Sequence, residues 1–128
     1  MTPVQYLEVE GVWLISPGPG ADCEIIVAGD ATGPATERLA LLERLALSLK
    51  DVEAQASAYL DIFVDRSRFA NADAWHLESI EAGRDPTSPV SELAVHFSIE
   101  GDIYGRWTVT LQEQDTRMFP VAFGRRQW

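Results

Sequence analysis

The clearest pattern in the chain is an alternation of hydrophobic and polar residues over positions 93–100. Its hydrophobic members are Leu93, Val95, Phe97 and Ile99, and the intervening residues are Ala94, His96, Ser98 and Glu100. Successive side chains of a strand point to opposite faces, so this pattern predicts a strand with one buried face. The same period recurs in Trp107, Val109 and Leu111, and in Phe119, Val121 and Phe123. The short connections between these segments predict an antiparallel meander of three strands.

Three further segments have the composition of strands. Residues 4–15 and 23–28 are rich in β-forming side chains, and the proline- and glycine-rich stretch 16–22 separates them. Together they predict an N-terminal hairpin. Residues 74–82 predict another strand, which ends at a loop where two prolines exclude regular structure.

Between residues 34 and 66 the hydrophobic period changes to three and four, which is typical of one face of a helix. The positions on that face are Leu39, Leu42, Leu45 or Ala46, Leu49, Val52, Ala56, Tyr59 or Leu60, and Phe63. Pro34 suits the first turn of a helix, and Glu37 suits its positive end. The pattern predicts one long helix, with Lys50 and Asp51 marking a point where it can break.

The predicted order is therefore β-β-α-β-β-β-β. A chain of 128 residues fits one hydrophobic core, so we expect a single domain over residues 1–128. The expected fold is a two-layer α+β fold, in which an antiparallel sheet, made of the N-terminal hairpin and the C-terminal meander, packs on one long helix.

The closing segment, residues 118–128, is expected to be a docked edge strand instead of a frayed end. Pro120 lacks the N–H group that a central strand needs, which favours an edge position. If the alternation is regular, Phe119 and Phe123 face the helix, Arg125 continues that row, and Arg126 lies on the other face.

Charge and composition narrow the classes of partner. The formal net charge is −10 and the isoelectric point is near 4.5, which disfavours nucleic acid because phosphate binding needs a concentrated basic surface. The start of the chain has no signal-peptide pattern and no long apolar run occurs, so we expect a cytoplasmic protein that does not bind membranes. Cys23 is the single cysteine, which excludes an intrachain disulfide.

Acidic residues dominate the N-terminal part, where every charged residue before Arg38 is acidic. Such a surface attracts a basic protein partner, although a solvated face that keeps the protein in solution is the commoner interpretation. The candidate binding residues on it are Glu8, Glu10, Asp22 and Glu24. Tryptophan and arginine are enriched in binding hot spots, so Arg125, Arg126 and Trp128 form a second candidate patch. The structural alternative for Arg125 is an ion pair with a carboxylate of the helix.

A ligand face is the other candidate site. His76 and Glu78 share one face of a predicted strand, and His96 and Glu100 share one face of another. If these strands pair, the four side chains can converge beside Arg126 and bind a small molecule or zinc. Solvent-facing polar residues are the commoner interpretation. No nucleophile or acid–base pair stands in a catalytic context, so we expect no enzymatic activity and no cofactor.

The segments "DIYGRWTVTL" and "PVAFGRRQW" resemble the C-terminal pattern of several small uncharacterised bacterial domain families. Some domains of this size and acidity are similar to the immunity proteins of bacterial polymorphic toxin systems. The resemblance implies an α+β fold and a bacterial source, and it transfers no catalytic residue.

Three hypotheses of function remain. The first is a non-enzymatic protein-binding domain of immunity or adaptor type, whose acidic surface meets a basic partner. The alternative is a domain, or an enzyme, that binds a small molecule or metal on the open face of the sheet. A homodimer formed by pairing of edge strands is compatible with either hypothesis.

Overall fold

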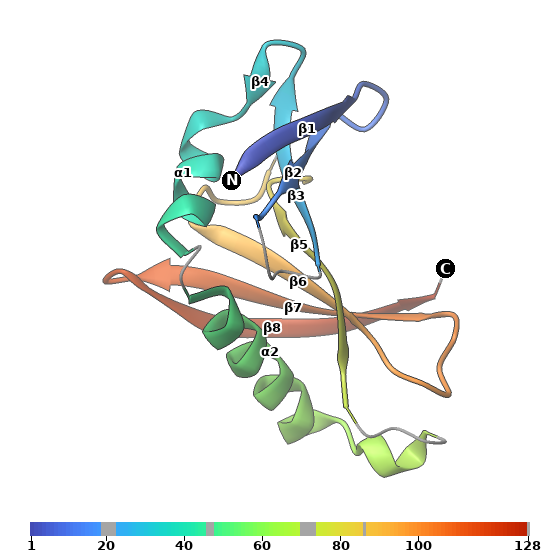
Figure 1. The fold of residues 1–128 in the computed structure, drawn as a ribbon. Coiled ribbons are helices and arrows are strands. Elements are labelled where there is room, and N and C mark those ends of the chain that lie inside the picture. Colours follow the sequence, from blue (N-terminus) through green and yellow to red (C-terminus); the bar gives the residue numbers. More distant parts are fainter. Residues whose placement is uncertain (19–22, 46–47, 70–73, 86, 128) are drawn as a thin grey trace.

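The computed structural model describes residues 1–18, 23–45, 48–69, 74–85 and 87–127. Within these ranges the chain forms eight strands, two α-helices and a short 3₁₀ helix (Figure 1). The strands are β1 (Thr2–Leu7), β2 (Val12–Ser16), β3 (Glu24–Asp30), β4 (Gly33–Pro34), β5 (His76–Ala82), β6 (Glu92–Ser98), β7 (Gly105–Gln114) and β8 (Arg117–Gln127). The helices are α1 (Thr36–Leu45), α2 (Leu49–Phe63) and the 3₁₀ helix η2 (Arg66–Arg68).

All eight strands belong to one mixed sheet. Its order is β1-β2-β3-β5-β6-β7-β8, and β4 pairs with β3 beside this path. Neighbouring strands are antiparallel except β3 and β5, which are parallel. A parallel pair needs a long crossover connection, and here α1 and α2 form that crossover.

The prediction of an antiparallel sheet on one long helix, in the order β-β-α-β-β-β-β, is therefore wrong. Residues 4–15 do not form one strand, because residues 8–11 turn the chain between β1 and β2. Gly11 has a φ of 66° and donates its N–H to the Leu7 carbonyl, which closes this turn. Val9, read as a strand residue, is fully exposed at the tip of the turn.

The helical segment also differs from its prediction, since it is divided into α1 and α2. The division lies between Leu45 and Leu49, slightly before the expected break at Lys50 and Asp51. Glu37 lies in the first turn of α1 as expected. Pro34 lies in β4, where it pairs with Gly29, and not in the helix.

The hydrophobic core lies between the helices and one face of the sheet. The predicted inward row of β6, including Val95 and Phe97, is completely buried. Leu42 of α1 and Val52 and Leu60 of α2 belong to the same core cluster. α1 contacts β3 and β5, and α2 contacts β7 and β8. Since buried residues of both helices share one core cluster with the inward residues of these strands, the helices cover one face of the sheet from β3 to β8 and leave the opposite face of these strands free of helices.

The C-terminal meander is confirmed, since β6 pairs with β7 and β7 with β8, each antiparallel. The expected edge position of β8 is also confirmed, because β8 is the last strand in the order of the sheet. The strand stays paired to its end, where Gln127 lies opposite Gly105. Trp128, which we expected to be docked, lies outside the described residues.

The alternation predicted for β8 is wrong, because a β-bulge interrupts this strand. Ala122 lies opposite Thr110 while Pro120 lies opposite Leu111, so Val121 is an extra residue in the ladder. An extra residue reverses the facing of all positions beyond it. As a result Phe119 does not share the inward row with Phe123, and Met118 is buried in the core instead.

Candidate functional site

The strand register places two rows of residues across the helix-free face. Paired residues of adjacent strands share a face. One row runs across five strands as Glu24, Ser79, His96, Thr108 and Gly124. The next row runs as Ile26, Glu81, Ala94, Thr110 and Ala122. These rows bring polar groups of β5, β6 and β7 together at the centre of the sheet.

A pocket of about 630 Å³ lies on this face. Five of its lining residues from β6, β7 and β8 have small side chains, namely Ala94, Thr108, Thr110, Ala122 and Gly124. Its charged lining residues include Glu81, Arg84, Arg106 and Arg126. A Cβ atom built on Gly124 would have no heavy atom within 4 Å, so the space above this residue is empty of protein.

Glu81 is the centre of the polar cluster in this pocket. Its side chain is only 6% exposed, and its Oε1 atom lies 3.4 Å from Arg106 Nη2. The other oxygen, Oε2, lies 3.3 Å from Arg84 Nε. Arg106 Nη2 also donates to Ser79 Oγ at 3.3 Å. The buried carboxylate thus holds two guanidinium groups that come from different parts of the chain.

The environment of Glu81 keeps it ionised. Burial raises the pKa of this carboxyl, but contact with the His96 imidazole and the charges of Arg84 and Arg106 outweigh burial, so its pKa lies below the ordinary value. A buried anion with nearby cations is common at functional sites and in structural ion-pair networks alike. The adjoining pocket is what makes this cluster a candidate functional site.

His96 connects the cluster to β7. Its Nδ1 atom lies 2.7 Å from Thr108 Oγ1, and its Nε2 atom lies 3.3 Å from Glu81 Oε1 without good hydrogen-bond geometry. The imidazole is therefore buried between a hydroxyl and a carboxylate, and is not a solvent-facing side chain. The sequence identified His96 as a candidate but missed Glu81, Arg106 and Thr108, because only the strand register shows that they meet it.

The other three candidates of the ligand face occupy a different place. His76, Glu78 and Glu100 line a separate pocket of about 520 Å³ near the start of β5, and Ser98 Oγ donates to Glu78 Oε1 at 2.6 Å. Arg106 lines both pockets. Within the described ranges no three His, Cys, Asp or Glu side chains are grouped so that they could hold a metal ion.

Arg125 and Arg126, neighbours in the sequence, have different surroundings. Arg125 forms a bidentate pair with Asp102, from Nη2 to Oδ1 at 2.7 Å and from Nε to Oδ2 at 2.9 Å. Trp107 Nε1 donates to the same Oδ2 atom at 2.9 Å. The hydrogen bond from Arg125 lowers the pKa of Asp102 and raises the pKa of Arg125 in return. Asp102 belongs to the β6–β7 connection, so the expected carboxylate partner exists but does not come from a helix.

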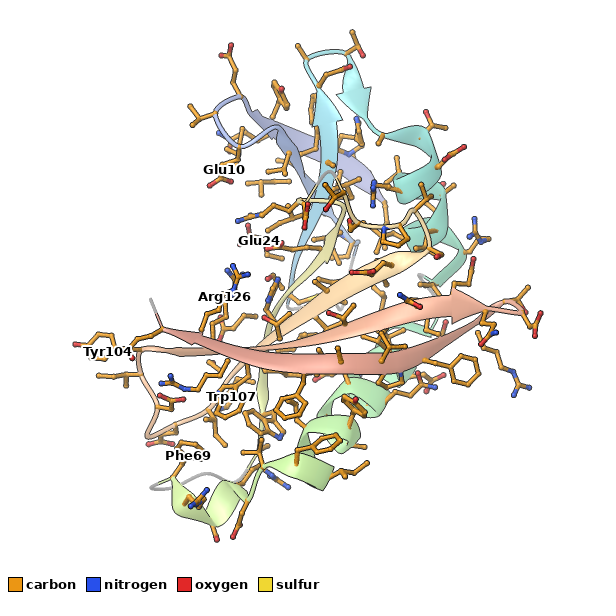
Figure 2. All side chains as sticks on the ribbon, turned by 180° about the vertical axis from the view of Figure 1, so that it is seen from behind. Glu10, Glu24, Phe69, Tyr104, Trp107 and Arg126 are labelled. Carbon is orange, nitrogen blue, oxygen red and sulfur yellow. The ribbon has the colours of Figure 1, made fainter. Side chains whose placement is uncertain are left out.

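Arg126 lies on the opposite side of the sheet. Figure 2 shows it on one side of β7 and β8, while Trp107 and Phe69 lie on the other side, toward α2. It is exposed, and its partner across the ladder is Arg106. Arg125 and Arg126 therefore do not form one patch.

The predicted acidic surface is divided as well. Glu8 and Glu10 lie in the β1–β2 turn, whereas Glu24 begins β3 at the other end of the paired strands (Figure 2). All three are exposed. Glu10 lies 3.7 Å from Arg84, so this acid is part of the charge network around the pocket. Asp22 lies outside the described residues.

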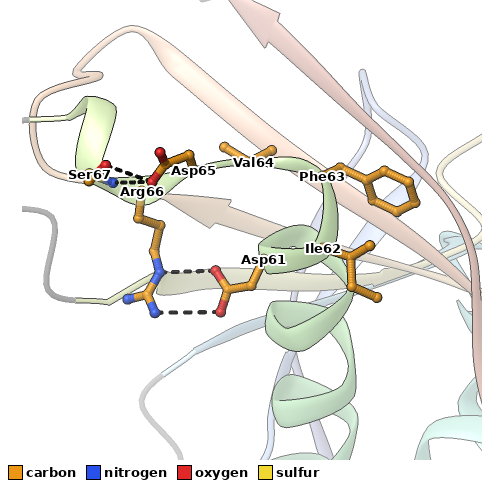
Figure 3. A pocket seen from close by; sticks show the side chains of 7 residues that line it. All are labelled: Asp61, Ile62, Phe63, Val64, Asp65, Arg66 and Ser67. Carbon is orange, nitrogen blue, oxygen red and sulfur yellow. Dashed lines mark hydrogen bonds and ion pairs between the residues drawn. The ribbon is translucent and has the colours of Figure 1, made fainter.

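A third hollow lies where α2 ends (Figure 3) and is lined by residues 61–67. Asp61 Oδ1 accepts hydrogen bonds from Trp75 Nε1 at 2.8 Å and from Arg66 Nε at 2.9 Å. Asp65 accepts from the N–H and the hydroxyl of Ser67, and these bonds lower its pKa. The carboxylates are occupied by the loop itself, so this hollow is a helix end and not a ligand site.

Comparison of the chain with protein-family models, with curated proteins and with solved structures finds no match. In the described part of the chain, neither helix has the length and apolar composition needed to span a bilayer.

Proposed function

We propose that this protein binds a small molecule in the pocket on the helix-free face of its sheet. The observation that carries the proposal is the ionised, buried Glu81 with its cationic partners beside an open pocket whose central positions carry small side chains. Ligand sites typically combine such a concave surface with a few fixed polar groups. The acidic residues of the N-terminal part support a single binding surface less well, since they lie at two separate places.

The arrangement of side chains also favours a site over a purely structural network. Ala94, Ala122 and Gly124 fill little of the space above the strands that carry them. Meanwhile His96 and Arg106 are held by hydrogen bonds and ion pairs, so their positions are fixed before a ligand arrives. Fixed polar groups lower the entropic cost of binding.

The experiment is a fragment screen by NMR on the labelled protein and on Gly124→Leu. Gly124 has no positive φ and its Cβ position is open, so a leucine there fills the pocket without a steric clash at Cβ. We expect some fragments to shift the NMR signals of the Thr108 and Thr110 amides. The Gly124→Leu substitution should lower the affinity of these fragments at least about tenfold. Ala58→Leu, at an exposed position of α2, is the control and should leave binding unchanged.

Either of two results would contradict the proposal. One is a screen in which no fragment shifts these amides. The other is a fragment that shifts them with the same affinity in wild type and in a folded Gly124→Leu protein.

A second candidate function is protein binding of the immunity or adaptor type. It is supported by an apolar patch where α2 meets the edge strand, which we call the α2–β8 patch and which consists of Ile62, Phe63 and Phe123. Phe63 stacks on Phe123 with ring centres 4.8 Å apart, yet Phe63 is 54% exposed and Ile62 is 73% exposed. Exposed aromatic clusters of this kind mark protein interfaces.

Affinity capture from a lysate of the source organism distinguishes the two surfaces proposed for a protein partner. The baits are wild type, Ile62→Glu, and the double variant Glu8→Gln, Glu10→Gln. A stoichiometric partner lost only with Ile62→Glu indicates the α2–β8 patch, because Ile62 is exposed and its replacement leaves the core intact. Loss only with the double variant indicates the acidic turn.

A further inference from the structure

We infer that the ligand of the helix-free pocket carries an anionic group, a carboxylate or a phosphate, which binds at Arg126 beside Arg106. This inference rests on the proposed function and adds the chemical class of the ligand to it. It is carried by the arrangement of arginines in the pocket.

Arg106 and Arg126 lie directly opposite each other on β7 and β8, on the same face. Like charges at opposed positions of a ladder destabilise a sheet. The charge of Arg106 is compensated by the Glu81 carboxylate at 3.4 Å, and Arg106 also donates a hydrogen bond to Ser79 Oγ at 3.3 Å. Arg126 makes no ion pair or side-chain hydrogen bond with any residue in the described ranges. An anion bound at Arg126 would supply the charge that this cross-strand pair lacks.

A cluster of arginines is unexpected in a chain that is acidic as a whole. The chain contains ten basic residues and a net charge of −10, yet three arginines on the helix-free face line this one pocket, namely Arg84, Arg106 and Arg126. The acidic lining residues are Glu81, Asp85 and Glu92. A ligand anion would be repelled by most of the surface, so a local group of guanidiniums is what its binding requires.

Arg126 is the arginine that we expect to contact the anionic group of the ligand, because the other arginines near the pocket already pair with carboxylates. Glu81 already contacts Arg84 and Arg106, whereas Arg125 is bound to Asp102 on the other side of the sheet. The planar fork of a guanidinium binds a carboxylate or phosphate through two parallel hydrogen bonds. Next to Arg126, Gly124 and Ala122 leave space on the sheet for a flat apolar body attached to the anion.

The test is an NMR titration with three probes of similar shape: benzoate, phenyl phosphate and benzamide. Benzamide is the neutral control for benzoate. We expect saturable shifts of the Thr108 and Gly124 amides with an anionic probe, at an affinity at least about tenfold higher than that of benzamide. Tighter binding of benzoate indicates a carboxylate ligand, and tighter binding of phenyl phosphate indicates a phosphate ester.

Arg126→Gln should lower the affinity for the anionic probe at least about tenfold and leave the affinity for benzamide unchanged. The matched control is Arg117→Gln, which removes an exposed arginine at the other end of β8, outside the pocket, and should change nothing. Both variants keep the core contacts, and their unfolding curves serve as the check of folding.

Equal affinity for benzoate and benzamide, or unchanged anion binding in Arg126→Gln, would overturn the inference. If neutral fragments still occupy the pocket in those experiments, the proposed function stands and only the anionic class is lost. If no probe and no fragment shifts the pocket amides, both fail.

Discussion

At the scale of single residues, the Glu81 carboxylate organises the helix-free face. It is nearly inaccessible to solvent, and it contacts side chains from β6, β7 and the segment after β5. Removing one member of a buried ion-pair network leaves the others without compensation. The stability of this face therefore depends on Glu81 more than on any exposed acid.

Glu81→Gln should lower the free energy of unfolding by about 3 kcal/mol, at the low end for a buried ion pair because Arg84 is partly exposed. Urea unfolding at pH 7 measures this effect. Glu24→Gln, on the same face but exposed, is the control and should change stability by less than about 0.5 kcal/mol. Equal stability of the two variants would show that the Glu81 network contributes nothing.

The pKa of Glu81 gives this difference a pH dependence. Since its pKa is lower in the folded protein than the ordinary 4.5, its stabilisation is complete above that value and is lost as the pH falls through the folded pKa. The stability gap between wild type and Glu81→Gln should therefore be constant above about pH 5 and narrow as the pH falls below the ordinary pKa of 4.5. Other acids with lowered pKa values, such as Asp102, are present in both proteins. Their contributions therefore cancel in the stability difference between wild type and Glu81→Gln. A gap that stays constant as the pH falls below 4.5 would contradict the assignment.

Two glycines of the β7–β8 hairpin should respond differently to the same substitution. A Cβ on Gly105 would collide with the Asp102 carboxylate, which binds Trp107 and Arg125. Gly105→Ala should therefore destabilise the protein by about 1–3 kcal/mol. Gly124→Ala meets open space and should be neutral or stabilising by up to about 1 kcal/mol. Thermal unfolding of the two variants measures the contrast, and similar losses for both would contradict it.

At the scale of elements, the bulge at Val121 determines which side chains of β8 reach the core. Deleting Val121 removes the extra residue and preserves every other pair of the ladder, so stability should change by no more than about 1 kcal/mol. Met118→Lys places a charge in the core and should cost at least about 2 kcal/mol, whereas Phe119→Lys, on the opposite face, should cost less than about 0.5 kcal/mol. Urea unfolding of the three variants tests the register, which would be wrong if Phe119→Lys cost as much as Met118→Lys.

The elements that the sequence predicted correctly are those with a local signal. Strict alternation identified β6 and β7, and the three-to-four period identified the residues of α1 and α2. The division of the first strand at Gly11, the parallel pairing of β3 with β5 and the bulge at Val121 depend on contacts between distant segments, which no local period records. The same limit applies to the candidate site. Alternation in the sequence placed His96 on the outer face, but only the pairing register of β5 and β6 shows that Glu81 lies beside His96.

At the scale of the whole molecule, the sheet has two outer strands, β1 and β8, among the described residues. An outer strand exposes unpaired backbone groups that can pair with another copy. Each of these strands contains a proline, Pro3 or Pro120, and each has an irregularity in its register beside that proline. Prolines and bulges are two of the devices by which natural sheets avoid such pairing.

Because both edge strands carry a proline and a bulge, we expect a monomer of 14.2 kDa at micromolar concentration. Without these two features, the edge strands would permit a homodimer. Removing both devices from β8, by deleting Val121 and replacing Pro120 with valine, should leave a regular strand beside the exposed Phe123 and Phe63 and should produce concentration-dependent self-association. Sedimentation velocity on wild type, on the double variant and on the double variant carrying Phe123→Lys measures it. Because the lysine puts a charge on the newly regular edge, it should restore the monomer. If wild type already dimerises and Phe123→Lys disrupts that dimer, the bulge and proline do not protect β8, and strand pairing is part of the native assembly.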